Sequence, residues 1–200
     1  MAHYVVTISR QFASMGRTIG LKMASNLGIE LYDRDIVKHT AERLGLEKGE
    51  VSHYDEKTGK RSFFLRDTYL FDFSVYDIHR NVFEVEKNII QDFAKKESCI
   101  IVGRCADSIL RDMPNVLNIF IYAPIEERLK NCVEQLGMDE TSALEKIRKV
   151  DDARSTYRHK FCPECVSEFN DRHIMIDSSK FGVEGTANIL TEIVKSSVGK

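Results

Sequence analysis

Hydrophobic residues along the chain form short β-branched runs that alternate with longer amphipathic stretches. The runs predict buried strands, because both faces of such a segment are apolar; they cover 4–9, 29–32, 98–103, 116–122 and 173–177. The stretches between them carry apolar residues at helical spacing, which predicts helices. Three of the expected helices begin at or just after Gly16, Asp33 and Pro124. The other four cover 77–96, 104–113, 139–158 and 183–196.

This alternation predicts an α/β fold in which a parallel sheet is covered by helices on both faces. Ligands of such sheets bind beyond the carboxyl ends of the strands. We therefore expect the loops that follow four of the strands to meet at one crevice. These loops begin after Ser9, Gly103, Ala123 and Asp177.

Composition narrows the class of protein without identifying it. The 200 residues suit one domain over 1–200, and a net charge of -2 gives no reason to expect nucleic acid or an anionic membrane as partner. No apolar run approaches the length of a bilayer span. Five cysteines without framework spacing, and a chain that enters a strand almost at once without a signal peptide, favour the cytoplasm.

The segment from Arg10 to Thr18 has the pattern of a phosphate-binding turn between a strand and a helix. Compared with G-x-x-x-x-G-K-[ST], Gln11 replaces the first glycine and Arg17 replaces the lysine. Gly16 permits close backbone approach, Arg17 keeps the positive charge, and Ser14 or Thr18 offers a hydroxyl to phosphate or Mg²⁺. The alternative is an ordinary strand–helix turn.

Two further positions follow predicted strands. Arg104 can clamp a phosphate, and Asp107, one helical turn later, can orient it. Asp33 can meet a sugar hydroxyl or a basic side chain. The alternatives are a surface arginine with a helix pair, and simple helix capping by Asp33.

Arg154 and Arg158 are four residues apart in a basic helical run and share a face. Such a pair suits a lid that closes over polyphosphate, although a solvated charged face has the same pattern. A second open question is Cys162 and Cys165, which supply two soft ligands where zinc needs four. A metal- or thiol-dependent regulator therefore stays an alternative.

Residues 47–75 are the least regular part of the chain and hold a Phe-rich stretch. Together with the helix over 77–96, this part is either the core of an acceptor-binding insertion or a homodimer surface.

Five segments, in order, resemble the motifs of the cytidylate kinase-like proteins, a branch of the nucleoside monophosphate kinases within the P-loop NTPases. The segments are 8–20 (ISRQFASMGRTIG), 28–36 (GIELYDRDI), 101–110 (IVGRCADSIL), 120–128 (FIYAPIEER) and 150–157 (VDDARSTY). The resemblance runs nearly from end to end, and five ordered motifs are far more specific than any one of them.

The resemblance implies ATP-dependent transfer of a phosphoryl group to a nucleoside monophosphate, with CMP or dCMP as the expected acceptor. It implies a three-layer P-loop kinase fold with an acceptor-binding insertion (about 34–96) and a lid (about 139–170). Mg²⁺ accompanies ATP, and no protein metal site is implied. ATP would be held by Arg10, Ser14, Met15, Gly16, Arg17 and Thr18. The acceptor would meet Asp33, Arg104 and Asp107, and Arg17, Arg154 and Arg158 would be catalytic.

The chain departs from the family pattern in the loop itself. Ala13 and Met15 stand where the family has glycines, and Gln11 stands where it has glutamate. Arg17 keeps the arginine that the family carries. The departures leave a second hypothesis open, in which a catalytically impaired regulatory protein binds nucleotide on the same fold.

Overall fold

The computed structural model describes residues 3–44, 73–163 and 171–198. Its strands are β1 (Val5–Arg10), β2 (Glu30–Tyr32), β3 (Cys99–Val102), β4 (Val116–Tyr122) and β5 (Ile174–Asp177). Its helices are α1 (Gly16–Leu27), α2 (Arg34–Leu44), α5 (Phe73–Lys96), α6 (Ala106–Ile109), α7 (Ile125–Glu134), α8 (Glu140–Phe161) and α9 (Ser178–Val198). The Phe-rich stretch and most of the irregular segment lie outside the described residues.

All five strands pair in parallel in the order β2-β3-β1-β4-β5. The central strand is β1, in which Val5 lies opposite Cys99 on β3 and Val116 on β4. A central parallel strand is covered on both faces, which explains the continuous apolar run that predicted it. The predicted α/β class with a parallel sheet is therefore confirmed.

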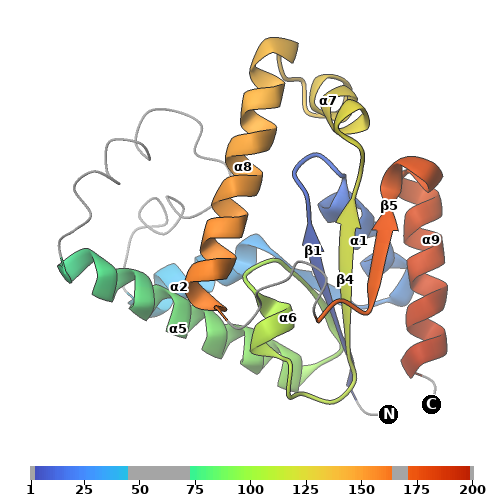
Figure 1. Cartoon of the computed structure of the whole chain (residues 1–200). Coiled ribbons are helices and arrows are strands. Elements are labelled where there is room, and N and C mark those ends of the chain that lie inside the picture. Colours follow the sequence, from blue (N-terminus) through green and yellow to red (C-terminus); the bar gives the residue numbers. More distant parts are fainter. Residues whose placement is uncertain (1–2, 45–72, 164–170, 199–200) are drawn as a thin grey trace.

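Alternate side chains of the strands enter two separate cores, because successive residues of a strand point to opposite faces. On one face, Val6 and Ile8 pack with residues of α1 and α9. On the other face, Val5 packs with residues of α2, α5 and α6. Figure 1 shows the resulting layers, with α9 on one side of the sheet and α5 and α6 on the other.

Three element boundaries differ from the sequence prediction. The helix expected over 104–113 is reduced to α6: it starts late because Arg104 and Cys105 take left-handed backbone with φ of 57° and 54°, and it ends where Leu110 leaves helical geometry with φ of -103°. Pro124 is the N-cap of α7 and not part of it. The last helix carries an additional short piece from Ser178, which a kink at Gly182, with φ of 64°, separates from the part that follows, and that part begins where the sequence placed it.

No helix in the described part of the chain is both long and apolar enough to cross a membrane.

A buried polar pair joins the central strands. The hydroxyl of Thr7 on β1 donates to Oδ1 of Asn118, its partner in register on β4, at 2.8 Å. The Asn118 amide in turn donates to the carbonyl of Asp171, just before β5, at 2.9 Å. The pair therefore connects β1 to the segment that leads into the edge strand.

We predict that Asn118→Leu lowers the free energy of unfolding by about 2–3 kcal/mol, because it leaves the buried Thr7 hydroxyl without an acceptor. Adding Thr7→Val removes that hydroxyl and should restore part of the loss. Urea denaturation of the single and double variants measures both effects. Strictly additive losses would contradict the proposed coupling.

Candidate functional site

The carboxyl ends of β1, β3, β4 and β5 meet around the turn between β1 and α1. The Gln11 side chain accepts from the Ala123 N–H after β4 at 3.2 Å, and the Ser178 hydroxyl after β5 donates to the Ser14 carbonyl at 2.8 Å. The predicted convergence of these loops is confirmed. The turn is thus the common point of the candidate site.

The Arg10 side chain lies between two glycines of the site. A Cβ on Gly16 would lie 2.8 Å from Cβ of Arg10, and a Cβ on Gly103 would collide with its Nη1. Gly103 also has a φ of 80°, which favours glycine. The two glycines therefore make room for a guanidinium that runs from β1 toward the end of β3.

Ala13 and Met15 both take left-handed backbone, with φ of 59° and 60°. This conformation costs an L-residue about 1–2 kcal/mol. The Ala13 methyl is buried against Cys132, Ala143 and Ile147, and Met15 packs against the core cluster that α1 and α9 cover. The turn thus keeps a glycine-like backbone while both side chains make apolar contacts.

The first turn of α1 offers a set of backbone donors. Its N-cap, Met15, makes no capping bond from its side chain. The first N–H groups of a helix have no acceptor within the helix, and they lie at its positive end. The amides at the start of α1 therefore form a site of the kind that binds phosphate.

The hydroxyl groups predicted for this turn lie in different environments. The Ser14 hydroxyl is buried, and its oxygen lies 3.0 Å from the Gln11 carbonyl oxygen and 3.1 Å from the Ile121 carbonyl oxygen, which share its single proton. It therefore braces the turn from inside. Thr18 is exposed in the first turn of α1.

Arg17 and Asp33, two predicted site residues, are in contact. Nε of Arg17 donates to Oδ2 of Asp33 at 2.6 Å, and the Arg17 side chain remains 46% exposed. The contact places the end of β2 beside the start of α1. Asp33 therefore meets a basic side chain, as one of the sequence hypotheses expected.

Arg104 lies against a buried carboxylate that sequence reasoning missed. Nη1 of Arg104 is 3.1 Å from Oε1 of Glu86, which is fully buried on α5. The Tyr157 hydroxyl of α8 donates to the other carboxylate oxygen at 2.6 Å. Burial and the Glu86 charge raise the pKa of Tyr157 well above its ordinary value, so its hydroxyl stays a donor. The available signal was an acid between Val82 and Ile90 on the apolar stripe of the predicted helix.

Asp107 has different partners from those expected. Sequence reasoning assigned it to orient Arg104, whereas its buried carboxylate accepts from Nη1 of Arg158 at 2.8 and 3.0 Å. Arg172 approaches the same carboxylate at 3.9 Å. Arg158 thus connects the end of α8 to α6, and Arg172 is a second residue that the sequence did not single out.

Arg154 lies closer to the turn. Its Nη1 donates to the Arg10 carbonyl at 2.9 Å. The two arginines predicted to share a face of α8 therefore contact two parts of the site, Arg154 the end of β1 and Arg158 the start of α6.

The cysteines form a pair that differs from the one in the sequence motif. Cys162 follows α8 and packs in one cluster with Cys105, while Cys165 lies outside the described residues. A hydrogen bond with Cys162, together with burial, raises the pKa of the Cys105 thiol above its ordinary range. Among the described residues, no group of three or more His, Cys, Asp or Glu side chains could hold a metal ion.

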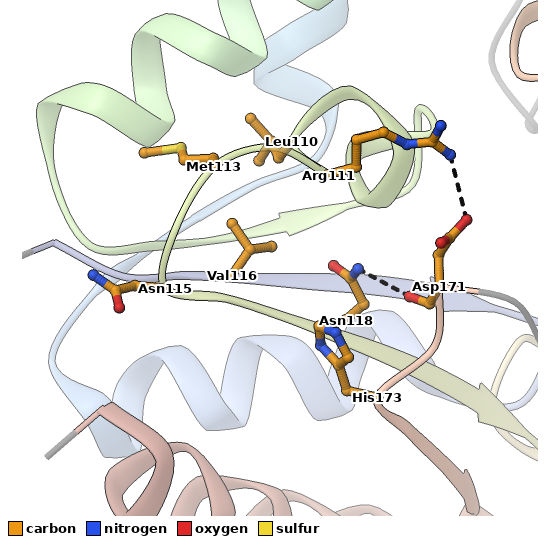
Figure 2. Close-up of a pocket in the computed structure, with 8 residues that line it drawn as sticks. All are labelled: Leu110, Arg111, Met113, Asn115, Val116, Asn118, Asp171 and His173. Carbon is orange, nitrogen blue, oxygen red and sulfur yellow. Dashed lines mark hydrogen bonds and ion pairs between the residues drawn. The ribbon is translucent and has the colours of Figure 1, made fainter. Parts of the chain in front are cut away.

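A cavity of about 270 Å³ lies at the amino end of β4, away from the turn (Figure 2). Its polar groups bind one another: Nδ1 of His173 accepts from the Asn118 N–H at 2.9 Å, and Arg111 lies 3.4 Å from Asp171. These contacts hold β4 to the segment before β5. We therefore place the candidate site at the β1–α1 turn and not at this cavity.

Comparisons with known proteins agree with this fold. A family model described as cytidylate kinase-like matches residues 5–180. A search of curated proteins gave no significant match.

The solved structures with a similar fold include the following three. An uncharacterized protein from Eubacterium ventriosum is 23% identical with a TM-score of 0.73, over 97% of this chain and 99% of its own. Shikimate kinase from Bacteroides thetaiotaomicron is 12% identical with a TM-score of 0.57, over 97% and 99%. Shikimate kinase from Acinetobacter baumannii, in complex with shikimate, is 12% identical with a TM-score of 0.54, over 98% and 94%.

The position of Arg10 can be tested with two alanine substitutions. Gly103→Ala and Gly137→Ala both place a Cβ at positive φ, but only the first displaces Arg10, since nothing lies within 4 Å of a Cβ on Gly137. We expect Gly103→Ala to lower the free energy of unfolding modestly more than Gly137→Ala, because the guanidinium end of Arg10 must shift in addition to the backbone strain that both variants share. Urea denaturation measures both. Equal losses would mean that Arg10 moves aside without cost.

Proposed function

The chain belongs to the cytidylate kinase-like family. From that premise we propose that it transfers the terminal phosphoryl group of ATP to a nucleoside monophosphate, with CMP or dCMP as the first acceptors to test. The observation that carries the proposal is the β1–α1 turn. It presents the uncapped amides of α1 beside Arg10 and Arg17 at the end of the central strand. This arrangement suits a polyphosphate.

The donor side uses the residues of this turn. The amides that begin α1 bind phosphate oxygens, and Arg10 supplies positive charge from the end of β1. Arg17 is bound to Asp33 through Nε, which leaves its two terminal nitrogens for a phosphate. The exposed Thr18 hydroxyl is an oxygen ligand of the kind that suits Mg²⁺, which would neutralise charge on the phosphates.

The acceptor side is formed by Arg104, Asp33 and Asp107. Glu86 and Tyr157 hold Arg104 in place, and Arg158 does the same for Asp107. We assign the acceptor-binding insertion to about 34–96 and the lid to about 139–170, of which α8 is the described part.

Phosphoryl transfer needs alignment and charge neutralisation more than proton transfer. In this proposal Arg17 and Arg154 neutralise charge near the turn. Arg158 acts from the acceptor side, and no side chain has to serve as a general base. Cytoplasmic location and a homodimer stay predictions.

We predict that the purified protein phosphorylates at least one member of a panel of nucleoside monophosphates in a coupled ATP assay. Arg17→Ala should lower kcat/KM by about 100-fold or more, because it removes a donor to the transferred group. Arg17→Lys should retain part of the activity, since the charge remains. Lys22→Ala, on the exposed face of the same helix, is the matched control and should behave as the wild type.

Two results would contradict the proposal in different ways. ATP binding without any product across the panel would favour the regulatory protein, for which the left-handed Ala13 and Met15 are the motivating observation. A protein that binds no ATP at all would contradict both functions.

A further inference from the structure

Both backbone groups of Phe12 are held by side chains from α7 and α8. Oδ1 of Asp151 accepts from the Phe12 N–H at 2.8 Å, and Nε of Arg128 donates to the Phe12 carbonyl at 2.7 Å. Nη2 of Arg128 also binds Oδ2 of Asp151. The two side chains and the peptide groups therefore close a ring of charge-assisted hydrogen bonds.

A third side chain extends this ring to the next residue. Asn131, one turn after Arg128 on α7, donates from Nδ2 to the Ala13 carbonyl at 2.9 Å. Arg128 is only 6% exposed, so its charge is compensated inside the protein. We call Arg128, Asn131 and Asp151 together the loop clamp.

The loop clamp fixes the two peptide planes that flank Ala13. The Phe12 carbonyl belongs to the peptide group that precedes the Ala13 Cα, and the Ala13 carbonyl belongs to the peptide group that follows it. Holding both carbonyls fixes φ and ψ of Ala13, whose φ is 59°. A non-glycine residue stays in this conformation only when its surroundings enforce it.

The same helix also contacts other parts of the site. Asp151, Arg154 and Arg158 lie three and four residues apart along α8, and they contact Phe12, Arg10 and Asp107 respectively. One face of α8 therefore spans the turn and the acceptor side. The loop clamp is the part of that face that acts on the turn's backbone.

We propose that Arg128, Asn131 and Asp151 are positioning residues for the donor nucleotide, which hold the turn in the conformation that receives phosphate. Without the clamp, Ala13 leaves the left-handed region most of the time, so only a fraction of the protein has a turn that can bind phosphate. The apparent affinity for ATP falls in proportion to that fraction. This inference rests on the proposed function, because it assigns the clamp to the site that would bind ATP.

The test compares Asp151→Asn with Asp152→Asn, which removes the same charge from the exposed neighbouring residue. Isothermal titration with ATP should show affinity about tenfold lower for Asp151→Asn, since a charge-assisted bond to a buried arginine is weakened. The Asp152→Asn protein should bind as the wild type does. Asn131→Ala, which removes one neutral bond, should give a smaller loss in the same direction.

Rescue by Ala13→Gly separates positioning from folding. Glycine reaches positive φ without a steric penalty, so Ala13→Gly combined with Asp151→Asn should recover ATP affinity to within about threefold of the wild type. The recovery should occur with little net regain in the free energy of unfolding, because the relief of backbone strain is offset by the loss of the buried Ala13 methyl and by the larger backbone entropy of glycine in the unfolded chain. Ala13→Gly alone should bind ATP nearly as the wild type does.

The outcomes that overturn the inference are distinct from failure of the proposed function. If Asp151→Asn loses stability but binds ATP like the wild type, the clamp is only structural. If Ala13→Gly restores no affinity, the clamp does not act through the Ala13 backbone. A wild type that binds no ATP in the same titration refutes the proposed function and, with it, the assignment of the clamp to the donor nucleotide.

Discussion

The turn from β1 into α1 is the constraint on which the rest of the structure depends. It carries Ala13 and Met15 at positive φ, so neighbouring groups must hold its peptide planes. β4 holds the Gln11 N–H through the Ile121 carbonyl at 3.1 Å, and the start of α9 holds the Ser14 carbonyl through Ser178. The sheet order that places β4 beside β1 is therefore also what makes the turn possible.

Ion pairs join several elements beside the turn, on the side assigned to the acceptor. Arg104, Arg158 and Arg172 lie against the two buried carboxylates of Glu86 and Asp107. Buried charges need partners, and each arginine here has at least one carboxylate nearby. The same pairs tie α5, α6 and α8 together.

The strands were predictable because a parallel strand buried on both faces leaves a continuous apolar run, as in β1 and β4. Helix α6 was predicted to start too early, because the spacing of apolar residues carries no information about the left-handed backbone of Arg104 and Cys105. Glu86 was hidden for the opposite reason. From sequence alone, a single acid within an apolar stripe is predicted to be exposed to solvent. Its burial becomes evident only when the structure places an arginine from another segment beside it.

The sequence by itself determined the α/β class, the position of the turn after the first strand and the family to which the chain is similar, because these depend on local runs and ordered motifs. The tertiary structure decided which side chains meet. Arg17 with Asp33, Asp107 with Arg158, and Phe12 with Asp151 are contacts between segments far apart in the chain. It also decided that Ala13 and Met15 keep a glycine-like backbone. Their conformation is enforced by hydrogen bonds and packing from helices α7, α8 and α9, and no local pattern in the turn encodes those partners.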